Sequence, residues 1–145
     1  MCGIAGLIHR GKSSNVGEEL QNMLQALKHR GPDSTGYALY ANNDGQNFIL
    51  RFKVGENVGE GSTSVNEDES VYDERKKLVD KKLSELGATI VKEDRLTPYS
   101  YRYEMKYDKD LMEFSKALES IESVEILSIG KSLELIKDLG DATAV

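Results

Sequence analysis

The chain begins MCGIAGLIHRG (residues 1–11), and this stretch contains its only cysteine, Cys2. Small and apolar residues alternate with glycines until a polar turn, a pattern typical of a strand buried on both faces. We therefore expect the first strand to start at residue 2. A cysteine at this position can be a buried small hydrophobe, an incidental residue at a frayed terminus, or a nucleophile that becomes the first residue once Met1 is removed.

A helix is predicted next, within SSNVGEELQNMLQALKHRG (residues 13–31). Asn15 or Ser14 can cap its first turn, and Gly31 follows its end. Apolar residues recur at the spacing of one helix face; they are Val16, Leu20, Met23, Leu24 and Leu27. These features together predict a helix that ends just before the turn GPDSTG (residues 31–36).

Two strands are expected after this turn, over YALYA (37–41) and NFILRFKV (47–54). The residues between them, NNDG (42–45), contain an Asp-Gly pair, which is a strong signal for a hairpin. Residues 1–55 would then form one domain. Residues 56–70 are rich in glycine and acidic side chains, so we expect an exposed linker there.

Residues 71–140 are predicted to form a second, α+β unit, in the order helix, strand, strand, helix, strand. The expected ranges are 72–87, 88–94, 99–107, 108–122 and 124–130, followed by a short helical stretch over 132–140. Asp108 is the expected cap of the second helix. The order of elements resembles a ferredoxin-like, or split βαβ, insert. Residues 141–145 would begin the return to the first domain.

Composition points to a soluble, globular, cytoplasmic protein, because 39% of the residues are hydrophobic and 30% are charged. No apolar run near the start approaches the roughly 20 residues that a membrane span needs. One cysteine and two histidines argue against a disulfide framework and a metal site, and no cofactor is predicted. The net charge of −6 argues against nonspecific binding to nucleic acid.

Charge also separates the two parts of the chain. Residues 1–55 carry six basic and four acidic side chains, whereas the remaining 90 residues carry 13 and 21. The first part is therefore about +2 and the second about −8. This contrast in charge indicates that the two parts of the chain are different pieces.

Cys2 has a base within reach if it becomes the first residue. A cysteine attacks a carboxamide carbon as the thiolate, and an unperturbed thiol, with a pKa of about 8.5, is mostly protonated at neutral pH. The free α-amino group of a first residue has a pKa of about 8 and lies beside its own side chain. A small second residue suits Met1 removal, and Gly3 would let other backbone approach the nucleophile closely.

The motifs MCGIAGL (1–7) and LKHRGPDSTGYAL (27–39), in this order and spacing, closely resemble the N-terminal signature of class II glutamine amidotransferases. These enzymes are N-terminal-nucleophile (Ntn) hydrolases that liberate ammonia from glutamine. The match covers residues 1–52. It implies the start of a layered αββα sandwich, with the α+β unit as an insert, and glutamine as the substrate.

The resemblance also assigns roles to residues. Cys2 would attack the glutamine amide, and Arg30 and Gly31 would form the wall of the active site. His29, Asp33 and Ser34 would support the turn. Simpler structural roles are available, because His29 and Arg30 can cap the end of the helix and Asp33 can make an Asx turn; for His29 and Asp33 we prefer these roles.

The sequence departs from the family pattern in its binding residues. Class II enzymes use an Asn-Gly pair as oxyanion hole, an arginine for the glutamine carboxylate and an aspartate for its amino group. The 145 residues contain no Asn-Gly pair and no Arg-x-Ala-Thr segment. We therefore expect the chain to be the front of a longer amidotransferase. Its insert looks like that of the stand-alone amidotransferase subunits of archaeal-type glutamate synthases, which would imply a synthase partner that takes the ammonia.

Two other functions remain open. The chain could be a degenerate, non-catalytic regulatory or assembly module, in which Lys131 either contacts an effector or simply occupies a turn. It could also be an Ntn amidase that cuts a different amide. An aromatic stripe could stack on sugars or bases, although sheet packing explains it more simply; its members are Tyr99, Tyr101, Tyr103 and Tyr107.

Overall fold

The computed structural model describes residues 3–11, 15–30, 34–40, 45–55, 68–143 and 145. Two compact units can be distinguished: Met1–Gly36 with Lys137–Val145, called here the first unit, and Tyr37–Ile136, called the second unit. The described elements are α1 (Val16–Ala26), the 3-10 turn η1 (Lys28–Arg30), β1 (Ser34–Tyr40), β2 (Phe48–Lys53), α2 (Glu69–Leu86), β3 (Thr89–Arg95), β4 (Ser100–Lys106), α3 (Leu111–Glu119), β5 (Glu125–Gly130) and β6 (Leu133–Leu139). The mixed α+β class expected from the sequence is confirmed.

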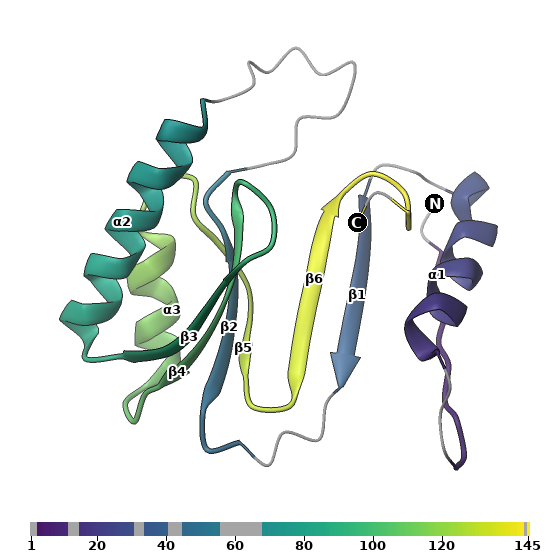
Figure 1. Cartoon of the computed structure of the whole chain (residues 1–145), viewed down its shortest axis with the longest axis horizontal. Helices are drawn as coiled ribbons and strands as arrows, with labels where there is room; N and C mark the ends of the chain where they lie inside the picture. The colour runs from purple at the N-terminus through teal and green to yellow at the C-terminus, as the bar shows by residue number, and fades with distance from the viewer. Residues whose placement is uncertain (1–2, 12–14, 31–33, 41–44, 56–67, 144) are drawn as a thin grey trace. The chain divides into compact units, whose positions relative to one another are not determined.

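The second unit contains a four-stranded sheet with the strand order β3-β4-β2-β5. Each pair of neighbouring strands is antiparallel. Along the chain the elements follow the order β2, α2, β3, β4, α3, β5, which is the βαββαβ order of the ferredoxin-like motif. Both helices lie on the same side of this sheet (Figure 1). The predicted order of helices and strands is therefore confirmed, with β2 as an additional first strand.

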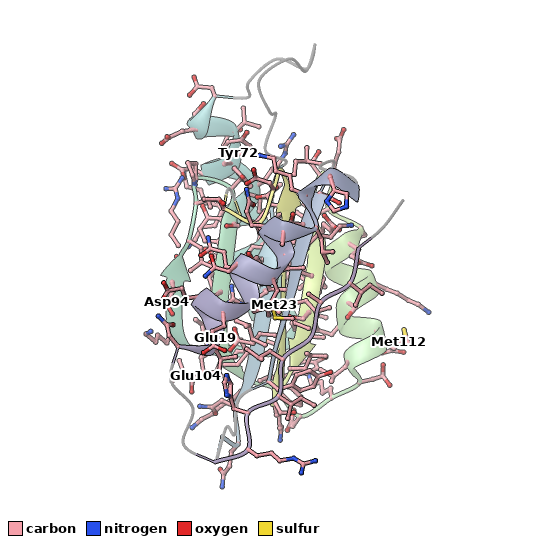
Figure 2. The ribbon with its side chains drawn as sticks, turned by 90° about the vertical axis from the view of Figure 1, so that its right-hand side faces the viewer. Glu19, Met23, Tyr72, Asp94, Glu104 and Met112 are labelled. Carbon is pink, nitrogen blue, oxygen red and sulfur yellow. The ribbon has the colours of Figure 1, made fainter. Side chains whose placement is uncertain are left out.

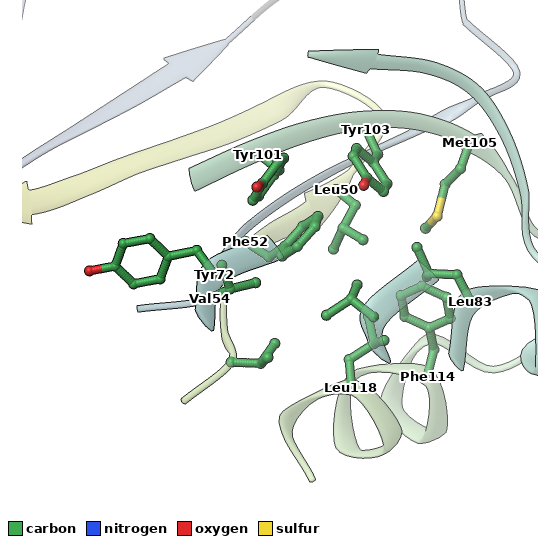
Figure 3. Close-up of a cluster of buried hydrophobic side chains, with 12 residues drawn as sticks. Leu50, Phe52, Val54, Tyr72, Leu83, Tyr101, Tyr103, Met105, Phe114 and Leu118 are labelled. Carbon is green, nitrogen blue, oxygen red and sulfur yellow. The ribbon is translucent and has the colours of Figure 1, made fainter. Parts of the chain in front are cut away.

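The core of the second unit lies between the sheet and its two helices (Figure 3). Leu50 and Phe52 of β2, and Val54 just after it, are fully buried in this core. The ring of Phe52 stacks on Tyr101 at 5.3 Å and meets Tyr103 edge-on at 5.1 Å. Tyr101 and Tyr103 are 2% and 0% exposed, so these two members of the aromatic stripe pack within the fold.

The opposite face of the sheet carries charged side chains. Glu134, at the start of β6, accepts hydrogen bonds from Arg51 Nε at 2.6 Å and from Arg102 Nε and Nη2 at 2.9 Å. The side chains of Arg51 and Glu134 are only 10% and 13% exposed. These contacts attach the beginning of β6 to the two central strands.

Polar contacts cap the ends of α2 and α3, and Gly87 ends α2 as predicted. Asp68 caps α2 by accepting a bond from Ser70 N, and Gly87 ends it in the left-handed conformation, with φ of 85°. Lys109 Nζ donates to Leu86 O at 2.9 Å and so satisfies a carbonyl of the last turn. The cap of α3 is Asp110, which accepts from Glu113 N at 2.8 Å, rather than the predicted Asp108.

The predicted hairpin between the strands after the first turn is wrong. Both strands form, but β1 pairs with β6, and β2 lies between β4 and β5. Residues 41–44, which hold most of the NNDG turn, lie outside the described residues. The physical reason is the burial of β2, since Ile49–Lys53 are all buried and need a strand on each side. The linker predicted over 56–70 falls mostly on residues 56–67, outside the described part.

The predicted helical stretch over 132–140 is also wrong, because these residues form the strand β6. Leu133, Ile136 and Leu139 have a spacing that suits a helix, but tertiary bonds outweigh it. Leu135 N donates to Ser128 Oγ at 3.0 Å, and Glu134 binds the two arginines described above. Such long-range contacts routinely override local propensity.

Substitution of Gly55 by alanine is expected to lower the free energy of unfolding of the second unit by about 2 kcal/mol. A Cβ at this buried position would lie 2.4 Å from Cε1 of Tyr72, whose ring also packs edge-on against Tyr99 at 5.8 Å. Urea unfolding followed by tyrosine fluorescence measures the loss. Gly130→Ala is the matched control, because its Cβ would meet Leu133 O at an ordinary 3.4 Å; equal losses in the two variants would contradict the prediction.

Candidate functional site

The N-terminal segment lies against α1 at two points. At the end of the helix, a Cβ placed on Gly3 would lie 3.2 Å from Cβ of Leu27, so the backbone at Gly3 approaches this side chain closely. At its beginning, His9 Nε2 lies 2.9 Å from Glu19 Oε2. Glu19 and Met23, both on α1, are labelled in Figure 2. The segment therefore runs antiparallel to the helix.

The predicted strand at the start of the chain is not found in the described residues 3–11. Ala5 and Leu7 are half-buried, whereas Ile4 and Ile8 are 93% and 91% exposed. The alternation in the sequence is thus real, but one face alone is covered. A strand needs a hydrogen-bonded neighbour, and within the described residues none pairs with this segment.

The end of α1 leads directly into the second half of the motif. Leu27 caps the helix, with its N–H donating to Leu24 O at 3.0 Å, and η1 then runs from Lys28 to Arg30. His29 Nδ1 lies 3.2 Å from Ala26 O, the contact of a side chain that caps the last turn. Lys28 and His29 follow the end of α1, where the helix dipole favours positive charge.

The remaining predicted site residues are placed only in part. Arg30 is the last residue of η1, and Ser34 is the exposed first residue of β1. Cys2, Gly31 and Asp33 lie outside the described residues. The contact between Gly3 and Leu27 nevertheless brings the neighbour of Cys2 to the residue that precedes Lys28-His29-Arg30.

The structure adds residues that sequence reasoning missed. Lys28 Nζ lies 2.7 Å from Asp141 Oδ2, and Thr35 Oγ1 donates to Gly140 O at 2.8 Å. Both partners come from the C-terminal end of the described chain, which belongs to the same unit as α1. No local signal in the sequence could have identified these contacts, because they join positions about 100 residues apart.

Among the residues that the structure describes, no group of three or more His, Cys, Asp or Glu side chains could hold a metal ion. Within the same ranges, none of the helices combines the length and apolar character required to cross a membrane.

The first part of the chain is similar to known glutamine amidotransferases. Residues 1–51 match the model of the glutamine amidotransferase domain family. The whole chain is 30% identical over 150 residues to a candidate glutamine amidotransferase of Methanothermobacter thermautotrophicus, of which it covers 45%. Over 40 residues, 28% of the chain, it is 50% identical to a candidate glutamine-hydrolysing asparagine synthetase of Methanocaldococcus jannaschii, of which it covers 8%.

These similarities are unevenly distributed. The family match ends at residue 51, within β2, whereas the similarity to the Methanothermobacter protein extends over the whole chain, including the α+β unit. The chain spans less than half the length of that curated relative. The comparisons therefore support a relationship to glutamine amidotransferases.

Proposed function

We propose that this chain is the front part of a class II, Ntn-type glutamine amidotransferase, which hydrolyses glutamine to glutamate and ammonia with Cys2 as its N-terminal nucleophile. The observation that carries the proposal is the contact of Gly3 with Leu27. It joins the two halves of the MCG…HRGPDS motif, which lie far apart in the sequence. The match of residues 1–51 to the glutamine amidotransferase domain family supports the same assignment.

The proposed reaction needs no group other than the residues named and water. After removal of Met1, the Cys2 thiolate attacks the side-chain amide carbon of glutamine, and its own α-amino group carries the proton to the departing nitrogen. The carbon–nitrogen bond breaks, ammonia leaves, and a γ-glutamyl thioester remains. Water then hydrolyses the thioester to glutamate and regenerates the thiol. Arg30 and Gly31 form the wall beside the nucleophile.

Such an enzyme also requires donors for the tetrahedral oxyanion and a cation for the substrate carboxylate. Loss of one oxyanion donor typically costs about 100- to 1000-fold in rate. The 145 residues contain no Asn-Gly pair to supply these donors in the manner of class II enzymes. In this proposal, both functions come from residues outside this sequence, and the βαββαβ unit is an insert within the amidotransferase domain.

For the ammonia, we propose a synthase acceptor of the archaeal glutamate synthase type. The support is the position of the α+β insert directly after the N-terminal motif, a feature of the resemblance described above. Formation of glutamate from 2-oxoglutarate by the chain with candidate synthase subunits would test this acceptor. Asparagine formation from aspartate under the same conditions would point to a different one.

The experiment that tests the proposed function measures ammonia release by the protein encoded by the complete gene. Glutamine, asparagine and a peptide amide are offered as substrates, and the intact mass reports whether Met1 is absent. We expect release from glutamine at least tenfold faster than from the others, and loss of Met1. Comparable rates would favour another Ntn amidase, and no release from any amide would favour a regulatory or assembly module.

Gly3→Ala is expected to slow glutamine hydrolysis about 3- to 10-fold. The added Cβ would meet Leu27 Cβ at 3.2 Å, so the backbone next to Cys2 must move by a few tenths of an ångström. Steady-state kinetics measures the effect. Gly6→Ala is the matched control, because nothing lies within 4 Å of its Cβ. A rate unchanged in the Gly3 variant would argue against a close fit of this segment in the active site.

A further inference from the structure

The C-terminal return segment, defined here as residues 140–143, is bound to α1 and η1 at three points. Lys28 Nζ lies 2.7 Å from Asp141 Oδ2. Gln21 Nε2 donates to Ala142 O at 3.3 Å, and Thr143 Oγ1 donates to Gln25 Oε1 at 3.3 Å. Ala142 is only 4% exposed, which shows that this attachment is a packed contact as well as a polar one.

The carboxylate of Asp141 is held in place by a second contact besides the one with Lys28. It accepts a second bond from the backbone N–H of Thr143 at 3.0 Å, the geometry of an Asx turn. Its side chain is 22% exposed, compared with 53% for Lys28. The aspartate is therefore the fixed partner, and the lysine is the residue that it restrains.

The return segment contacts both η1 and β1. Lys28, bound by Asp141, is the first residue of η1, which leads into the turn. Thr35, the second residue of β1, donates to Gly140 O at 2.8 Å. Two consecutive residues of the return segment thus hold positions 28 and 35, which enclose the predicted wall and turn-support residues 29–34.

We infer that Asp141 is a positioning residue for the wall of the glutamine site. This inference rests on the proposed function, in which Arg30 and Gly31 lie beside the nucleophile. Through Lys28, Asp141 would hold η1, which carries Arg30, without contacting substrate itself. A wall that binds substrate and transition state alike affects KM rather than kcat.

The experiment uses Asp141→Asn in the protein encoded by the complete gene. We expect KM for glutamine to rise about 5- to 10-fold and kcat to change less than twofold. The rise is modest because the ion pair is partly exposed. Asp73→Asn is the control, since Asp73 pairs with Arg95 at 3.3 Å on the second unit and should leave both constants unchanged. Exchange of the two charges, with Lys28→Asp and Asp141→Lys together, should restore KM at least partly.

Amide hydrogen exchange of residues 28–35 gives a readout that does not depend on activity. Exchange should be at least tenfold faster in Asp141→Asn than in Asp73→Asn. Unchanged exchange would overturn the inference, as would faster exchange with an unchanged KM, or a fall in kcat at constant KM. If Cys2→Ala retains glutamine hydrolysis, the proposed function fails instead, so the two failures can be distinguished.

Discussion

Cys2→Ala is expected to reduce glutamine-dependent ammonia release by the complete protein by about 1000-fold or more. In the proposed mechanism the substitution removes the thiolate that forms the thioester, and no other cysteine in the 145 residues can replace it. Alanine is small and apolar, so removal of Met1 and folding should both persist. Initial rates of ammonia formation, with the intact mass and circular dichroism of the variant, provide the measurement.

A second variant separates the nucleophile from its position in the chain. Insertion of one residue between Met1 and Cys2 keeps the thiol but takes away its own α-amino group as a base. If Cys2 acts as proposed, this variant should lose nearly as much activity as the alanine variant. Release within twofold of the unmodified protein by the alanine variant would refute the catalytic role of Cys2, and the same result for the insertion variant would refute the role of its α-amino group.

The fold of the second unit was largely predictable from the sequence, because its signals are local. The two helices between 68 and 119 have capping aspartates, and Gly87 ends the first of them. The errors concern strands whose partners lie far away in the chain. An Asp-Gly pair predicted a hairpin between β1 and β2, but β2 lies between β4 and β5. The helix predicted near the C-terminus is the strand β6, which pairs with β1. The spacing of apolar residues describes a single segment, whereas the pairing of a strand depends on segments elsewhere in the chain.

The sequence alone reveals the motif of the candidate site, but not the contacts that hold the motif residues in place. Cysteine followed by glycine and the HRGPDS turn can be read directly from the sequence, and the contact of Gly3 with Leu27 gives them a spatial connection. The Asp141 and Gly140 contacts could not be foreseen, because nothing near residue 141 indicates that it lies beside Lys28. The side chain of His29 lies where a helix cap would place it.

Glu134→Gln is expected to lower the free energy of unfolding of the second unit by about 2 to 3 kcal/mol at neutral pH. Removal of one partner from a largely buried ion pair leaves the other charge poorly compensated, and here two arginines bind the same carboxylate. Partial exposure of Arg102, 21% for its side chain, reduces the cost below that of a fully buried pair. Urea unfolding followed by tyrosine fluorescence measures the difference, with Glu119→Gln on the exposed end of α3 as the control.

The pKa of Glu134 determines how this difference in the free energy of unfolding depends on pH. Hydrogen bonds from Arg102 and Arg51 hold the pKa of the Glu134 carboxyl below its ordinary value, against the opposing effect of burial. A carboxyl with a lowered folded-state pKa stabilises the protein above its unfolded pKa of about 4.3, and this contribution is lost as the pH falls through the folded value. The gap in unfolding free energy between the unmodified protein and Glu134→Gln should therefore be constant above about pH 5.5 and shrink towards pH 3. A gap that stays constant over this interval, or one as small as that of Glu119→Gln, would show that the arginines do not depend on this carboxylate.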